Sequence, residues 1–351
     1  MKQLKFIVFL ILSVILLAGC VSKNEAFSHS GFYFDTAVSM TLYGKDGKSE
    51  ENTAIFDETC SYFNDQISSH TDSGAIFELN TKNSVSVDKN IAAILTISAS
   101  YTSILPGYDF GLGNLIDLWD IKSENPHVPS DEEIKAALQP VLDKTYKITA
   151  DGDVYTFAKS SDFKVDLGGI AKGYVGDILR AKLMEKGITS GILNMGSSTI
   201  ILIGSKPDGS DYKLAMQKPF SETGESDHVL NVSNAAVSTS GVYERYFEQN
   251  GKIYHHILNP FTGYPTENEL YGVTVIVKYD GSVTNEVLPD IDFAGALSDA
   301  LSTALMVQGT EHGLKLVESL PNVEAIFINN EYNYTYSSGI VLDGNTFSLL
   351  D

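Results

Sequence analysis

Residues 166–174 read Asp-Leu-Gly-Gly-Ile-Ala-Lys-Gly-Tyr, which predicts a short strand over 164–166, a turn at the paired glycines and the start of a helix. The helix has apolar residues at helical spacing and ends at a glycine; these residues are Ala171, Val175, Ile178, Leu179, Leu183 and Gly187. Such a junction leaves N–H groups unpaired at the positive end of a helix, where glycine lets a phosphate or a metal ion approach the backbone. The spacing matches neither a Walker loop nor G-x-G-x-x-G, so a tight structural turn and a phosphate site are equally good interpretations.

The segments around this stretch predict a single α+β domain. Strands are expected over 32–43, 192–202, 212–216, 228–232, 271–277 and 324–328, and helices over 91–104 and 292–308. Residues 146–149 and 154–157 predict a hairpin, and Ser130 with Glu133 a capping box ahead of a further helix. Strands and helices do not alternate regularly, which excludes a doubly wound sheet and favours α+β with mixed or antiparallel sheets and packed helices. Residues 31–351 contain no linker or repeat, so we expect one domain there.

The chain carries a large negative charge. It has 24 Lys and Arg against 45 Asp and Glu among 351 residues, a formal charge of −21. This charge repels nucleic acid, which we exclude as a partner. A small phosphate ligand would need backbone N–H groups or a divalent cation to offset the carboxylates.

The N-terminus predicts a lipoprotein signal. Lys2 and Lys5 precede an apolar run over 6–17 that is short for a membrane span, and Leu-Ala-Gly-Cys follows at 17–20. This order resembles the bacterial lipobox, which implies a signal peptide over 1–19, palmitate or a similar acyl chain on Cys20 and a tether over 20–30. The protein would then be anchored by lipid at the extracytoplasmic face of the cell membrane. An ordinary secretory signal with an incidental cysteine is the alternative.

Cys60 has no partner for a disulfide or a cysteine metal site once Cys20 carries lipid. It lies in a predicted helix over 53–68, where Phe56, Phe63 and Ile67 share its spacing. We therefore expect a buried structural thiol.

Asp299 and Thr303 lie four residues apart in the helix predicted over 292–308, which Gly309 ends. Their side chains leave the same face and offer Mg²⁺ two hard oxygen ligands. By spacing alone, a polar pair on an exposed face is the more common explanation.

Two further stretches form predicted loops at strand ends. Residues 238–245 contain hydroxyls, a glycine and Arg245 that can bind phosphate oxygens, and residues 255–263 contain histidines that can move a proton near neutral pH. A structural histidine is the default interpretation, and no zinc pattern is present. The only Trp, at position 119 of a glycine-rich loop, is expected in the core.

Taken together, these motifs resemble the ApbE family of FAD:protein FMN transferases. The resemblance covers about 32–328 and rests on the ordered motifs at 166–174, 194–196, 238–245, 256–263 and 299–303. It implies a flavin cleft between the sheets and helices, FAD as substrate and Mg²⁺ as cofactor. It also implies transfer of FMN to a Ser or Thr hydroxyl of an acceptor flavoprotein, with release of AMP. The acceptors of the family are subunits of sodium-pumping quinone reductase or Rnf-type complexes.

The resemblance also assigns site residues by position. The metal ligands fall on the Gly169 carbonyl, Asp299 and Thr303, and His256 is a candidate acid or base. The flavin-site residues fall on Phe34, Gly107, Tyr108, Asp109, Asp166, Lys172 and Ile257.

The sequence departs from the family pattern at a few positions. Asp35 stands in place of a glycine, Ser197 and Ser198 replace a glycine and an Asn or Asp, and Asn259 replaces a frequent Asp. Asn259 keeps a side-chain oxygen for capping its loop. Two other functions stay open: an FAD pyrophosphatase that makes FMN and AMP, and a lipoprotein that only binds flavin.

Overall fold

The structure is a computed structural model that describes residues 25–44, 46–68, 72–159, 162–196, 198–221 and 225–350. It is organised around one eight-stranded sheet in which all neighbouring strands are antiparallel. In spatial order its strands are β1 (Ala26–Tyr33), β2 (Thr36–Tyr43), β6 (Gly191–Asn194), β7 (Thr199–Ile203), β10 (Ala235–Gly241), β13 (Leu270–Lys278), β14 (Val323–Asn329) and β15 (Tyr334–Tyr336). Segments from both ends of the described chain therefore meet in one sheet.

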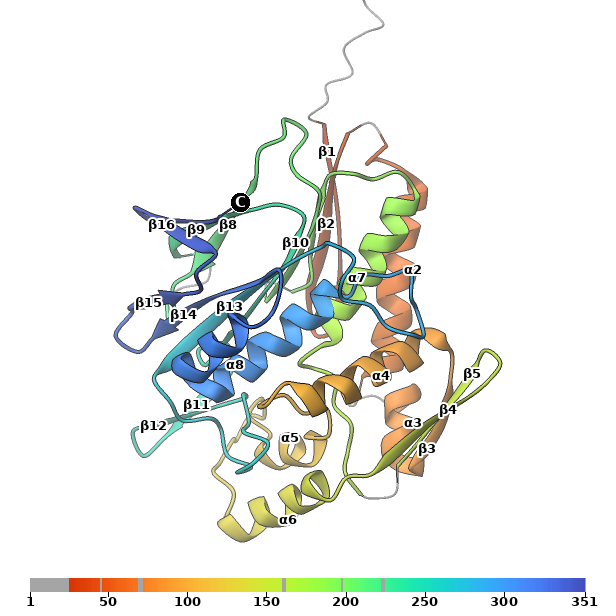
Figure 1. Ribbon diagram of the computed structural model, residues 1–351. Helices are drawn as coiled ribbons and strands as arrows, with labels where there is room; N and C mark the ends of the chain where they lie inside the picture. Colours follow the sequence, from red (N-terminus) through yellow and green to blue (C-terminus); the bar gives the residue numbers. More distant parts are fainter. Residues whose placement is uncertain are drawn as a thin grey trace, which may run out of the picture.

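Helices cover one face of this sheet. They are α2 (Glu50–Ile67), α7 (Ala171–Glu185) and α8 (Ala294–Val317). Figure 1 shows α8 lying across the strands, with α7 packed beside α2. The apolar faces of the strands and helices form the main core, to which Val273 and Val275 of β13 and Leu301 and Leu305 of α8 contribute. This packing brings α8 against the strand β10, whose motif the sequence had singled out.

A small sheet covers the opposite face. Its strands in order are β16 (Ile340–Asp343), β17 (Thr346–Leu349), β9 (Ser226–Val232) and β8 (Tyr212–Gln217). A second core lies between the two sheets, where Leu230 and Phe347 meet Ile276 and Ile326. Alternate residues of β13 and β14 thus face different cores, as the period-two geometry of a strand requires.

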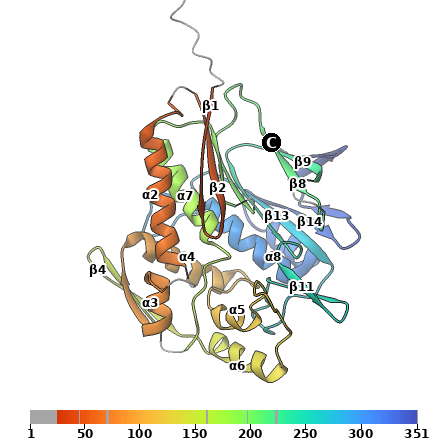
Figure 2. The ribbon, with the colours of Figure 1, turned by 180° about the vertical axis from the view of Figure 1, so that it is seen from behind.

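A third part of the molecule extends below the sheet in Figure 2. It contains α3 (Ala75–Lys82), α4 (Lys89–Ile104), α5 (Gly113–Trp119), α6 (Asp131–Leu142), β3 (Ser84–Val87), β4 (Tyr146–Asp151) and β5 (Val154–Lys159). The hairpin of β11 (Tyr246–Gln249) and β12 (Lys252–His255) leads into the 255–263 loop. Trp119 is buried and donates its Nε1–H to the Gly263 carbonyl at 2.8 Å, which fastens α5 to that loop.

The prediction of one strand over 32–43 was wrong. Those residues span the end of β1, a turn and β2, and both turn residues have positive φ, 54° at Phe34 and 58° at Asp35. Two-residue turns of this hand favour Asn and Gly, so Phe-Asp gives no local signal. The Phe34 N–H donates to Asn64 Oδ1 of α2 at 2.9 Å, a tertiary contact that stabilises the turn.

Other predicted boundaries also changed. The strand over 192–202 is two strands, β6 and β7, and the strand over 164–166 is only an isolated bridge from Lys164 to Leu112. Gly309 interrupts α8 with a non-helical φ of 74° where the sequence predicts the end of that helix, and a second helical stretch follows it to Val317. Residues 26–30, placed in the tether, belong to β1 and pair with β2.

The α+β class is confirmed, as are the capping box of α6 and the β4–β5 hairpin. Cys60 is a free, fully buried thiol of α2, and burial raises its pKa to about 12. No helix among the described residues has the length and hydropathy to cross a membrane. Cys20 and the predicted signal peptide lie outside the described residues.

Asp177 of α7 holds the N-terminus of α8. Its carboxyl is buried and accepts hydrogen bonds from the Tyr279 hydroxyl at 2.5 Å and from the N–H groups of Gly295 and Ala296, both at 2.9 Å. These donors are buried with the carboxyl, so its removal would leave them unsatisfied.

We therefore expect Asp177→Ala to lower the free energy of unfolding by about 3 kcal/mol. Urea denaturation measures this, with Asp65→Ala on the exposed face of α2 as the matched control, expected within about 0.5 kcal/mol of the unchanged chain. Equal losses in both variants would contradict this role for Asp177.

Candidate functional site

The turn before α7 is built by its own side chains and by a neighbouring loop. Asp166 Oδ1 accepts the N–H of Gly168 at 2.9 Å, and the Asp166 N–H donates to the Phe110 carbonyl at 2.8 Å. The first turn of α7 therefore points its backbone toward the 107–113 loop, with Tyr108 beside Gly169.

Gly169 lies next to α8. A Cβ placed on it would be 3.6 Å from Thr303 Oγ1 and 3.5 Å from the Tyr108 ring. The Gly173 N–H, four residues later, donates to Asp299 Oδ2 at 3.1 Å, and no backbone hydrogen bond to the Gly169 carbonyl is found in the described part of the chain. The structure thus brings the three predicted metal ligands together and leaves the carbonyl available.

Asp299 and Thr303 face a layer of hydroxyls on the sheet. Asp299 Oδ1 accepts from Thr199 at 3.2 Å, and Thr303 Oγ1 lies 3.4 Å from Ser240 Oγ. Ser238 is bonded to Ser298 of α8 at 2.8 Å. The pair is therefore held inside the α8–β10 interface and is not an exposed polar pair: Asp299 is 5% exposed.

These donors fit Mg²⁺. Each is a hard oxygen, and a carboxylate that accepts two hydrogen bonds still has lone pairs for a cation. Among the described residues, no group of three or more His, Cys, Asp or Glu that could hold a metal is present. A cation here would keep positions for water or phosphate oxygens, which is how Mg²⁺ is usually bound.

Positive side chains gather beside this oxygen cluster. Lys172 Nζ lies 3.9 Å from Asp299 Oδ2 and 3.4 Å from the Gly168 carbonyl. Burial lowers the pKa of Lys122, and the charge of Arg245 lowers it further. Burial raises the pKa of Glu244, and the positive charges of Arg245 and Lys172 oppose this rise. Lys122, Lys172 and Arg245 therefore form a local cationic group in an acidic protein, suited to phosphates.

The sequence predicted no role for Lys122 or Glu244. Lys122 follows α5 and belongs to no motif, and it reaches Asp35 at 3.7 Å only because the β1–β2 turn lies opposite. A lone lysine in a loop carries no signal of its own, so only the fold could place it here.

His256 is uncharged at neutral pH. Its Nδ1 lies 3.3 Å from the Arg245 carbonyl and must donate to it, which leaves the lone pair on Nε2. Burial and the charge of Arg245 lower its pKa to about 3. His255 is different: it is buried, its Nε2 donates to the Thr266 carbonyl at 2.9 Å, and it is structural.

The lowered pKa of His256 predicts a pH effect on stability. An unfolded histidine binds a proton near pH 6.5, so between about pH 6.5 and 3 the unfolded state holds a proton that the folded state lacks. The stability from this histidine is therefore full above pH 6.5 and lost as the pH falls. The slope of the unfolding free energy against pH is proportional to the number of protons taken up on unfolding. We expect His256→Gln to lower that number by up to about one, as measured by urea denaturation between pH 7.5 and 5. Equal slopes would contradict the shift.

The flavin-site residues assigned by the resemblance lie in different settings. Gly107, with φ of 98°, packs against the Ala304 carbonyl of α8, where a Cβ would come within 2.8 Å. Tyr108 is 4% exposed, and Phe34 holds a left-handed turn, a conformation that is common at functional sites. Ile257 is buried beside His255, its N–H donating to His255 Nδ1 at 3.3 Å.

Asp109 is committed to other partners. Its Oδ2 lies 2.5 Å from Lys144 Nζ, and its Oδ1 accepts the Gly111 N–H at 2.8 Å. Both carboxylate oxygens thus order the 107–113 loop itself, so this side chain supports the site from behind.

Asn259 behaves as expected from the sequence. Its Oδ1 accepts the Phe261 N–H at 2.9 Å and closes the 255–263 loop. Ser197 lies outside the described residues, and the Ser198 carbonyl accepts the Thr239 N–H at 2.8 Å.

The fold and the site define an α+β protein whose oxygen ligands, helix end and cations suit a metal-bound phosphate ligand. The model of the ApbE family matches residues 34–327, so the chain belongs to that family, as its motifs predicted. An FAD:protein FMN transferase of Klebsiella pneumoniae is 26% identical over 325 residues, covering 91% of this chain and 94% of the relative.

Solved structures agree with the fold. The ApbE protein of Thermotoga maritima is similar with a TM-score of 0.76 at 24% identity, covering 90% of this chain and 97% of that one. The flavin transferase ApbE from Vibrio cholerae has a TM-score of 0.72 at 26% identity, covering 90% and 97%. The similarity extends along nearly the whole described chain.

Proposed function

We propose that this protein transfers FMN from FAD to a Ser or Thr hydroxyl of an acceptor flavoprotein and releases AMP. The observation that carries the proposal is the meeting of the Gly169 turn with Asp299 and Thr303, at the positive end of α7. The names of the curated relatives, FAD:protein FMN transferases, support the same reaction.

Mg²⁺ would be held by the Gly169 carbonyl, Asp299 and Thr303, and when bound it would offset the charge of the pyrophosphate. The chain's own groups do the rest. The positive end of the α7 dipole, with Lys172 and Arg245, attracts and orients the phosphates. The negative charge of the bound phosphates would raise the pKa of His256, whose Nε2 then accepts the proton of the acceptor hydroxyl as its oxygen bonds to the FMN phosphorus and the bond to the AMP phosphate breaks.

We further propose that Cys20 carries lipid and holds the enzyme at the extracytoplasmic face of the cell membrane. The acceptors would then be subunits of membrane flavoproteins of the sodium-pumping quinone reductase or Rnf type. Mass spectrometry of the membrane-extracted protein tests the anchor, since acylation at Cys20 adds a defined mass that Cys20→Ala lacks.

The transfer itself is tested by weighing the acceptor. The chain from Lys23 onward keeps β1 and is incubated with FAD, Mg²⁺ and a soluble acceptor domain. A gain equal to FMN minus water supports transfer. Free FMN and AMP with an unchanged acceptor would indicate hydrolysis, because the nucleophile is not part of this chain and water can use the same site.

A further inference from the structure

A pocket of about 320 Å³ lies between the two sheets, on the face of β10 opposite Asp299 and Thr303. Ser238 and Ser240 of β10 point to α8, whereas Val237 and Thr239, which alternate with them, line the pocket. The pocket is therefore separate from the oxygen cluster, although the two share a strand.

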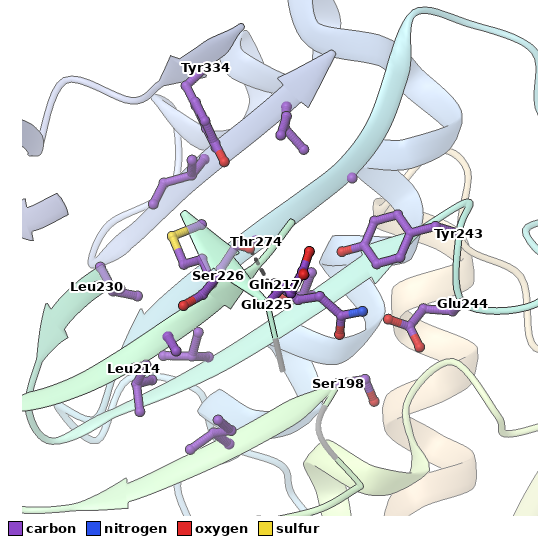
Figure 3. Close-up of a pocket in the computed structure, with 18 of the residues that line it drawn as sticks. Ser198, Leu214, Gln217, Glu225, Ser226, Leu230, Tyr243, Glu244, Thr274 and Tyr334 are labelled. Atoms are coloured by element: carbon purple, nitrogen blue, oxygen red, sulfur yellow. Dashed lines mark hydrogen bonds between the residues drawn. The ribbon is translucent and has the colours of Figure 1, made fainter. Parts of the chain in front are cut away.

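The lining is mostly apolar and contains no basic side chain. Figure 3 shows Leu214 and Leu230 toward one side, with Ser198, Tyr243 and Glu244 toward the other. Glu225 also lines it. Carboxylates without a neighbouring basic side chain repel phosphate groups, so this pocket does not suit a pyrophosphate. It suits a ligand that is apolar, neutral or positively charged.

The pocket runs along a free strand edge. Four consecutive residues of β8, 214–217, line it, although successive side chains of a strand point to opposite sides. Such a lining requires the pocket to follow the backbone edge of β8. Among the described strands β8 pairs only with β9, so its outer N–H and C=O groups are available to another extended chain.

One end of the pocket reaches the reaction site. Glu244 lines the pocket and is followed in the chain by Arg245, whose carbonyl lies 3.3 Å from His256 Nδ1. The Ser198 carbonyl is bonded to Thr239 N–H at 2.8 Å, at the end of β10 where Ser240 meets Thr303. A chain leaving the pocket at Ser198 and Glu244 therefore arrives beside the cations and His256.

We infer that this groove, defined by β8 and the pocket beside it, binds the acceptor protein. An extended acceptor segment pairs with the edge of β8 and places an apolar side chain in the pocket, and its Ser or Thr then continues past Glu244. The inference rests on the proposed function, which needs a place for a second substrate. The flavin-site candidates Phe34, Tyr108 and Lys172 do not line this pocket, so a flavin held by these residues would leave it open to the acceptor.

The test compares Met216→Glu and Ala215→Glu with Val341→Glu in the transfer assay. Met216 is half-buried and Ala215 exposed, and both line the groove; Val341 is 42% exposed on β16 of the same small sheet and lies outside it. Added carboxylates repel an apolar or basic segment, so the groove variants should raise the KM for the acceptor at least about tenfold. The KM for FAD should not change in either groove variant. Ala215→Glu, whose side chain is exposed, should also keep the thermal midpoint, and Val341→Glu should behave as the unchanged chain.

The experiment distinguishes a wrong inference about the acceptor groove from a wrong proposal of FMN transfer. If the unchanged enzyme modifies the acceptor but the groove variants keep its KM, the acceptor binds elsewhere and the inference is overturned. If the unchanged enzyme never modifies it, the proposed function fails first. A photo-crosslinker on Ala215→Cys gives a second measurement: crosslinks to the acceptor near its modified hydroxyl support the groove, and an acceptor that is modified without any crosslink to it overturns the inference.

Discussion

Asp299→Ala is expected to abolish AMP release from FAD, with a loss of at least about 10³-fold in kcat/KM. Asp299 is the only carboxylate among the proposed metal ligands, and without it Thr303 and a backbone carbonyl would offer a cation no negative charge. Lys172, 3.9 Å away, would lose its counter-charge as well. Chromatographic measurement of AMP, with and without acceptor, detects the loss.

Two controls separate chemistry from folding. Asp65→Ala removes an exposed carboxylate from α2 and should leave AMP release unchanged. Asp299→Asn keeps an acceptor oxygen for Thr199 but not the charge, so it should remain folded and still lose activity. AMP release that survives in Asp299→Ala, or in the unchanged protein after Mg²⁺ is chelated, would refute both the transferase and the pyrophosphatase readings and favour flavin storage.

His256→Gln is expected to lower the rate of FMN transfer by about 10²- to 10³-fold while FAD binding stays within about twofold. Gln keeps a donor for the Arg245 carbonyl but cannot take a proton at neutral pH. Single-turnover kinetics with saturating FAD and acceptor measure the chemical step, and fluorescence titration measures FAD binding.

His255→Gln is the matched comparison for this prediction. His255 is buried against the Thr266 carbonyl, so its substitution should lower the thermal midpoint rather than the chemical step of the folded fraction. A His256→Gln enzyme with the normal rate would show that the acceptor or solvent takes the proton, and would remove His256 from the reaction.

Local patterns predicted much of this molecule from the sequence. The capping box at Ser130 and Glu133, the burial of Cys60 and the common face of Asp299 and Thr303 each depend on residues a few positions apart. Contacts of that range are set by helix geometry, which spacing alone reports. Ordered motifs extended the prediction to the family, because their sum is far more specific than any one.

Predictions failed where a distant segment overrode the local pattern. Phe34 adopts a left-handed turn, and Asn64 of α2 accepts its N–H. That contact leaves no trace in the sequence near Phe34. The same is true of Lys122, whose place beside Arg245 depends on how the loop after α5 meets the β1–β2 turn.

The amino-acid order alone predicted the class of fold, the family and the acidic charge, and through the resemblance to the family it proposed the oxygen ligands. Tertiary structure decided that the turn at Gly169 lies against Thr303 of α8, and that the Gly173 N–H donates to Asp299 across 126 residues of chain. It also decided that the two faces of β10 have different neighbours: the oxygen cluster with α8 lies on one face and the groove lies on the other. The oxygen cluster and the groove both depend on the packing of α8 and of β8 against opposite faces of the large sheet. The free energy of such packing is spread over many residues, so no single motif predicts it.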